Sequence, residues 1–151
     1  MAQKILGYEF QNEDWLWEAL QAPGSNVIMV NERLLAQGNK GLATLGDAVA
    51  TLIVKLDCYA MNRSIGDTVT ILQRAVNNSR FAILCDRAGL TACINCNPSQ
   101  RGSVSPRTRA DTLEAVIGAV YKDSGIDSAR SVMESLQIIE YCDLGEVLPT
   151  L

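Results

Sequence analysis

Residues 39–61, NKGLATLGDAVATLIVKLDCYAM, form a stretch that would be apolar almost all the way round a helix. Such a segment is typical of a central helix that other helices surround. Only 5% of the residues are aromatic, although 48% are hydrophobic. This composition favours helices packed on helices over a sandwich of aromatic-rich strands. We therefore predict an all-α fold, a helical bundle built around this segment.

Shorter helices are predicted on both sides of the central one. Asn12 and the acids after it give an N-capped start to a helix that stops before Pro23. Apolar residues at helical spacing predict further helices at residues 65–75, 78–89, 108–122 and 127–136. Residues 90–108 lack this periodicity and contain several Pro and Gly residues, so we expect a loop there.

The length and composition predict one domain over residues 1–151. No apolar run is long enough to span a bilayer, and the first residues lack the layout of a secretory signal. We therefore expect a soluble, intracellular protein without a membrane partner; the sequence does not distinguish cytoplasm, nucleus or mitochondrion.

The charge pattern narrows the possible chemistry. The formal net charge is −4, so the chain lacks the broad basic field by which most nucleic-acid binders attract phosphate. Local basic residues remain at Arg101, Arg107 and Arg109, which could contact RNA phosphates or pair with the domain's own carboxylates. The chain has no histidine, which excludes a Ser-His-Asp triad and imidazole metal ligands.

Three acids are the candidate site. Asp47 lies within the most apolar helix, where an ionised carboxylate is costly unless it is paired or binds a metal. Asp111 and Glu114 are three residues apart, so they share one helix face and could share one cation. Carboxylates without histidine favour Mg²⁺ or Mn²⁺, which could activate water at a phosphodiester. From spacing alone, the simpler interpretation is structural, with Asp111 and Glu114 as first-turn acids that complement the helix dipole.

Two sequence blocks favour the metal site over that structural interpretation. Residues 42–49, LATLGDAV, and residues 110–125, ADTLEAVIGAVYKDSG, resemble the two signature blocks of the ribonuclease III catalytic domain, in the same order and at a similar separation. The resemblance extends over about residues 5–136 and leaves residues 137–151 as a C-terminal tail. It implies an all-helical, homodimeric endonuclease in which each subunit holds one Mg²⁺-dependent site and cuts one strand of double-stranded RNA.

The resemblance assigns residues to roles. Asp47, Asp111 and Glu114 match three of the family's four metal-binding acids, and we expect them to be both catalytic and metal-binding. Ala43 stands where the fourth acid belongs, and Lys40 stands at an outer glutamate position. We expect Lys40, Arg101, Arg107 and Arg109 to contact RNA. The family's double-stranded-RNA-binding domain is not found in this sequence, and the stretch before Asp47 resembles small stand-alone fungal members.

These observations give one leading hypothesis and two alternatives. The leading hypothesis is a Mg²⁺-dependent (or Mn²⁺-dependent) endoribonuclease that acts on double-stranded or stem-loop RNA. Ala43 and Lys40 favour the second, a catalytically impaired RNA-binding or structural protein that resembles the ribonuclease III-like subunits of mitochondrial ribosomes. The third is a helical dimerisation module without RNA, in which Asp111 and Glu114 have only dipole roles.

Overall fold

The computed structural model describes residues 1–100 and 102–140. Its elements, in chain order, are α1 (Ala2–Leu6), α2 (Asp14–Ala19), β1 (Met29–Val30), β2 (Arg33–Leu34), α3 (Lys40–Ala60), α4 (Ile65–Ala75), α5 (Asn78–Ala88), the 3₁₀ helices η1 (Leu90–Cys93) and η2 (Pro98–Gln100), α6 (Pro106–Ser124) and α7 (Ile126–Ser135). The prediction of an all-α fold is confirmed, apart from one two-stranded hairpin.

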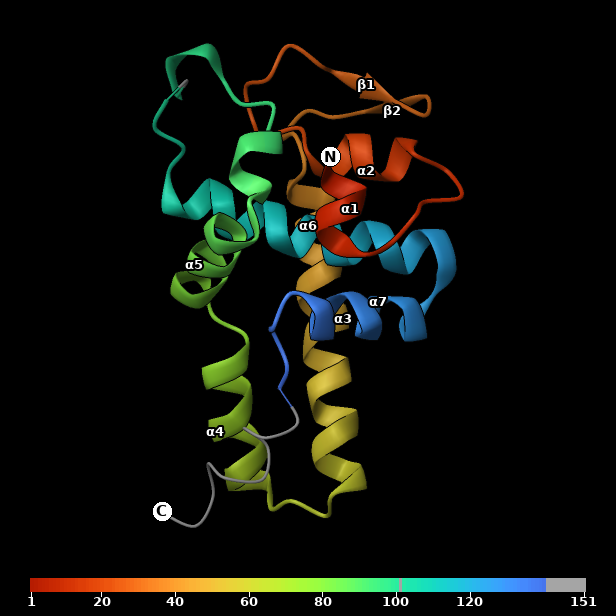
Figure 1. Cartoon of the computed structure of the whole chain (residues 1–151), viewed down its shortest axis with the longest axis vertical. Helices are drawn as coiled ribbons and strands as arrows, with labels where there is room; N and C mark the ends of the chain where they lie inside the picture. The colour runs from red at the N-terminus through yellow and green to blue at the C-terminus, as the bar shows by residue number, and fades with distance from the viewer. Residues whose placement is uncertain (101, 141–151) are drawn as a thin grey trace.

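Helix α6 is the centre of the molecule. Its middle, from Ala110 to Val120, is buried at every position except Glu114. It packs against α3, α5, α2 and α7. Figure 1 shows α3 running along the long axis of the molecule and α6 crossing it, with the lower half of α3 and all of α4 extending side by side beyond the remaining helices.

Polar caps fix where three of the helices begin. The Ser64 hydroxyl accepts a hydrogen bond from Asp67 N–H at the start of α4, and the Asn77 side chain accepts one from Arg80 N–H at the start of α5. Ser105 Oγ accepts from Thr108 N–H at the start of α6, where Pro106 occupies the first position. These partners satisfy N–H groups that have no acceptor within the helix.

The structure corrects three details of the predicted elements. Residues 90–108 are not a simple loop, because they contain η1, η2 and the first turn of α6. The hairpin β1–β2 was not predicted; its turn residues Asn31 and Glu32 have φ values of 52° and 61°, the left-handed pair that a two-residue hairpin turn requires. Helix α1 was also not predicted. None of the helices in the described ranges combines the length and hydropathy that a membrane crossing requires.

Candidate metal and nucleic-acid site

A glycine contact between α3 and α6 sets the geometry of the site. A Cβ atom added to Gly46 would lie 1.7 Å from the carbonyl oxygen of Glu114, and one added to Gly118 would lie 2.5 Å from the carbonyl oxygen of Leu42. The two backbones therefore touch, which only glycine at both positions permits. Asp47 follows Gly46 directly, so this contact brings its helix face next to the acids of α6.

A second contact holds the start of α3. Asn39 is completely buried, and its Nδ2 donates to the Ala19 carbonyl oxygen at 2.7 Å and to Thr112 Oγ1 at 3.1 Å. Since Thr112 is the residue after Asp111, this side chain joins α2, α3 and α6 beside the acids. The start of α3 is thus fixed relative to α6 at two points, Asn39 and Gly46.

The angle between the two helices contains an open cavity of about 390 Å³. All three predicted acids line it, and two of the four predicted RNA-contacting residues do so as well. The lining residues are Lys40, Ala43, Thr44, Asp47, Asn78, Arg107, Asp111 and Glu114.

Each helix contributes one face to this cavity. Lys40, Thr44 and Asp47 follow at intervals of four and three residues on α3, and Arg107, Asp111 and Glu114 do the same on α6. Residues at this spacing lie one above the other on a helix. Both faces therefore begin with a base and end with an acid; the residue between them is Thr44 on α3 and Asp111 on α6.

The acids affect one another electrostatically. The pKa of the Glu114 carboxyl is raised to about 7, chiefly by burial and then by the nearby Asp47 and Asp111 carboxylates, while Arg107 opposes the shift. Arg107 Nε lies 3.6 Å from Asp111 Oδ1. The interior of the cavity is therefore a place where negative charge is concentrated and only partly neutralised.

The prediction that Asp47 would be buried is wrong. We expected this carboxylate to be buried among apolar neighbours, but Asp47 is exposed, because it lies on the side of α3 that opens into the cavity. Glu114 is the acid that burial affects most. Burial therefore disfavours the ionised carboxylate at Glu114 on α6, whereas Asp47 on α3 is exposed to solvent.

The donor set fits a hydrated hard cation. The cavity offers carboxylate oxygens without imidazole, and its volume leaves room for water beside an ion. In the described part of the chain, no group of three or more Cys, Asp or Glu side chains is arranged to hold a metal ion as it stands. Mg²⁺ usually keeps several of its waters, which suits an open cavity better than a closed cage.

The remaining predicted residues lie elsewhere or were missed. Arg109 Nη1 forms an ion pair with Asp86 Oδ2 at 2.9 Å, with only 21% of the Arg109 side chain exposed. Arg101 lies outside the described residues. Asn78 was missed; it reaches the cavity from the first turn of α5, and nothing in its own neighbourhood signals proximity to the acids.

Fold and site together define a class: an all-helical domain with an acidic cavity between two crossing helices. A family model described as "Ribonuclease-III-like" matches residues 29–140, and the chain belongs to that family. The prediction of the family is therefore confirmed.

Individual relatives agree with this assignment. The chain is 31% identical over 145 residues to Ribonuclease 3 of Campylobacter curvus and 32% identical over 156 residues to that of Symbiobacterium thermophilum. These alignments cover 93% and 95% of this chain but 60% and 62% of the relatives, so the chain spans about 60% of the length of the curated relatives it matches. Both relatives are bacterial, and they do not bear on the resemblance to fungal members.

Solved structures support the fold. The nuclease domain of ribonuclease III from Campylobacter jejuni, in a structure concerned with flexibility in the region involved in dimer formation, superposes with a TM-score of 0.77 at 26% identity, covering 89% of this chain and 92% of that one. A second structure of that nuclease domain gives a TM-score of 0.75 at 24% identity and covers 99% and 95%, which shows the fold alone.

Proposed function

We propose that this protein is a divalent-metal-dependent endoribonuclease that hydrolyses phosphodiester bonds in double-stranded RNA. One observation carries the proposal: in a ribonuclease-III-like chain, Asp47 of α3 and Asp111 and Glu114 of α6 line one open cavity. The relatives from Campylobacter curvus and Symbiobacterium thermophilum are both named Ribonuclease 3.

In this proposal the three acids are the metal ligands. Asp47, Asp111 and Glu114 would hold Mg²⁺ or Mn²⁺, directly or through water. The ion would supply a Lewis acid that activates water and stabilises charge on the phosphodiester. Arg107 forms an ion pair with Asp111, its Nε lying 3.6 Å from Asp111 Oδ1. Without a cation the pKa of Glu114 is raised to about 7. A bound divalent cation would favour its ionised form, so that this carboxylate can serve as a ligand.

Cleavage of a labelled RNA duplex tests the proposal. We expect the purified protein to cut a perfect duplex or a stem-loop with Mg²⁺ or Mn²⁺ and to be inactive with chelator. The Glu114→Gln variant should cut at least a hundredfold more slowly. A Glu114→Gln variant that cut as fast as the parent with Mg²⁺ would contradict the assigned site. Arg101 and Arg109 are the further candidates for contact with the RNA backbone.

Ala43 supports a second candidate function. It lines the cavity at the place where a fourth carboxylate would face the ion, and its methyl group offers no oxygen. In this alternative the chain binds RNA but has lost cleavage. A parent that is silent with every divalent ion, beside an Ala43→Glu variant that cuts, would favour a disabled enzyme; metal-dependent cutting by the parent would favour the first proposal.

We also propose that the protein is a homodimer. Leu52, Leu56 and Tyr59 are 48%, 43% and 87% exposed on one face of α3, and Ile65 and Val69 are 87% and 48% exposed on the adjoining α4. This face lies where α3 and α4 extend beyond the other helices (Figure 1). Large exposed apolar faces mark association sites. A second copy of the chain is the favoured occupant, because the similar C. jejuni nuclease domain has a region involved in dimer formation.

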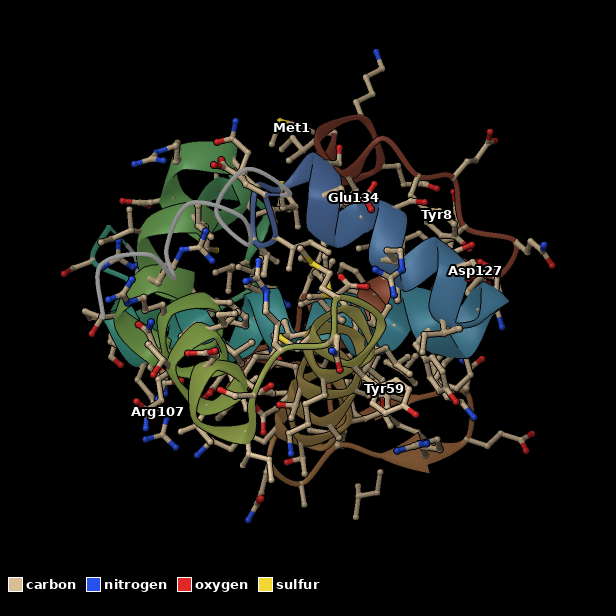
Figure 2. All side chains as sticks on the ribbon, turned by 90° about the horizontal axis from the view of Figure 1, so that it is seen from below. Met1, Tyr8, Tyr59, Arg107, Asp127 and Glu134 are labelled. Carbon is tan, nitrogen blue, oxygen red and sulfur yellow. The ribbon has the colours of Figure 1, made fainter. Side chains whose placement is uncertain are left out.

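The proposed dimer leaves the cavity accessible. Figure 2 shows Arg107 at the outer edge of the molecule, well apart from Tyr59 on α3. The apolar face and the basic edge of the cavity are therefore separate surfaces, so one can bind a second copy while the other binds RNA.

A further inference from the structure

Two side-chain cations share the cavity with the three acids, and they lie near its mouth. Lys40 is exposed at the first position of α3, and the side chain of Arg107 is 72% exposed near the start of α6. By contrast, Asp111 is buried at 8% exposure, and Glu114 is partly buried. The interior of the cavity is therefore acidic, whereas its edge carries the two bases beside the exposed Asp47.

The two bases differ in how they are held. Arg107 already has a partner, because its Nε lies 3.6 Å from Asp111 Oδ1. Lys40 forms no ion pair with any residue in the described ranges. A lysine ammonium is a compact charge on a flexible stem, so it can move to meet an anion that enters the mouth.

The charges of the cavity favour one divalent ion over two. Three carboxylates and two side-chain cations give a net charge of −1, since −3 + 2 = −1. One divalent cation brings this to +1, which a single backbone phosphate then neutralises. Two divalent cations would bring it to +3 before any substrate arrived, and Ala43 supplies no carboxylate to offset the second ion.

We propose that this cavity binds a single hydrated divalent cation, and that the Lys40 ammonium, together with Arg107, binds the nucleic-acid phosphate at its mouth in place of a second ion. This inference rests on the proposed function for the identity of the polyanion. Lys40 is thus a phosphate-binding residue of the site. Lys40 and Ala43 together limit the cavity to one metal ion, because Lys40 adds a positive charge and Ala43 supplies no carboxylate.

Counting bound metal tests the first half. Mn²⁺ titration of the full chain, followed by electron paramagnetic resonance of the free ion, should give one Mn²⁺ per chain, and Asp111→Asn should abolish it. The double variant Ala43→Glu with Lys40→Glu restores two carboxylates and should bind two Mn²⁺. Two ions in the parent, or none, would overturn the proposal.

Duplex binding tests the second half without requiring cleavage. The affinity for the duplex is measured by fluorescence anisotropy with Ca²⁺ present, and a gel checks that the duplex stays intact. At low salt, Lys40→Gln should bind the duplex about fivefold more weakly than the parent, and the slope of its affinity against salt concentration should fall by the equivalent of about one phosphate contact. The metal stoichiometry should stay at one. The matched control is Lys4→Gln, which removes an exposed lysine of α1 and should leave both quantities unchanged.

The outcomes separate this inference from the proposed function. A parent that binds duplex and one Mn²⁺ but never cuts RNA would contradict the proposed nuclease while supporting the one-ion cavity. Equal affinity and equal salt dependence in Lys40→Gln and the parent would overturn the role of Lys40, whether or not the protein cuts. No measurable duplex binding by the parent would overturn both proposals.

Discussion

At the scale of single residues, Glu114 lines the candidate site and lowers the stability of the fold when it is ionised. Its carboxyl pKa of about 7 lies well above the ordinary 4.5, chiefly because of burial and then because of Asp47 and Asp111. The unfolded chain releases this proton at lower pH than the folded chain does. The folded state therefore loses stability as the pH rises from about 4.5 towards 7, and does not regain it above that.

The first prediction follows from that sign. In chelator at pH 8, Glu114→Gln should be more stable than the parent by about 1–2 kcal/mol, a value reduced to allow for solvent screening at this partly open site. The corresponding rise in melting temperature is about 3–6 °C. Thermal unfolding at pH 8 and pH 5 measures it. The gain should fall to about a quarter of this at pH 5, just above the unfolded pKa of 4.5. An equal gain at both pH values would show that ionisation of Glu114 is not its cause.

Asp123 is the opposite case. Burial raises its pKa, but hydrogen bonds from the Tyr8 hydroxyl and from the backbone N–H groups of Asn12 and Gln11 lower it by more, so the net pKa lies below 3.8. This carboxylate fixes the segment between α1 and α2 to the end of α6. Its contribution to stability is present above pH 3.8 and is lost as the pH falls through the lower folded value.

The second prediction concerns this attachment. Asp123→Ala should destabilise the protein at pH 7 by about 1–3 kcal/mol, because three donors lose their charged acceptor. Urea unfolding at pH 7 and at pH 3 measures the effect, which should shrink at the lower pH. Glu9→Gln, an exposed acid in the same segment, is the control and should change stability little. A loss at pH 3 as large as at pH 7 would argue against the ionised carboxylate.

At the scale of elements, the crossing of α3 and α6 determines whether the acids meet. Gly46 and Gly118 allow the backbones to touch, and Asp47 depends on that approach for its place in the cavity. Packing at such a contact cannot relax through side-chain rotation, because the clashing atoms of the partner helix are backbone atoms. The geometry of the site is therefore sensitive to one added methyl group.

The third prediction compares two glycines of the same helix. Gly46→Ala should cost at least about 3 kcal/mol, since overpacking a tight core contact typically costs 1–3 kcal/mol and here the new atom meets a carbonyl oxygen at 1.7 Å. Gly41→Ala meets nothing within 4 Å and should gain up to about 1 kcal/mol from helix propensity. Urea unfolding of both variants, with Mn²⁺ binding as a second readout, checks this. Equal stabilities would refute the backbone contact.

The sequence predicted the long elements better than the short ones. The central helix was expected at residues 39–61 and spans Lys40–Ala60, because a long apolar pattern leaves few alternatives. The hairpin β1–β2 has only two residues in each strand, too few to show an alternating pattern. Helix α1 is similarly short, and α6 begins two residues earlier than expected because Pro106 suits the first helical position.

The site was predictable in part for the same kind of reason. Asp111 and Glu114 share a helix face by spacing alone, whereas the approach of Asp47 depends on a tertiary contact that only the family resemblance anticipated. Asn78 enters the cavity from α5, so no local pattern could place it there. Arg109 was expected at the RNA surface, and its ion pair with Asp86 depends on how α5 packs against α6.

At the scale of the whole molecule, the exposed apolar face of α3 and α4 is the strongest indication of assembly. Helix α4 and the end of α3 bury little of their surface within one chain, since Ile71 is the only residue that α4 buries. Leu52, Leu56 and Tyr59 recur at the four- and three-residue spacing of one helix face. A second copy placed on this face would cover side chains that one copy leaves in water.

The fourth prediction tests that assembly. Leu56→Glu should convert the protein from a dimer to a monomer at micromolar concentration, because an unpaired charge in an apolar interface costs several kcal/mol. Sedimentation equilibrium measures the change in mass. Ile83→Glu is the matched control, because Ile83 is an exposed apolar residue of α5 rather than of α3 or α4; this variant should remain dimeric. A parent that is monomeric throughout would refute the homodimer.

The glycine crossing also bears on how this family can change over evolution. Since the two helices are held together by backbone contact and by the buried Asn39, the carboxylates themselves contribute nothing to joining them, and Glu114 even opposes folding when ionised. An acid of this cavity can therefore be exchanged for another residue without loss of the scaffold. The residues that form the helix crossing and the carboxylates of the cavity can therefore change independently, so a descendant can lose the carboxylates and keep the fold.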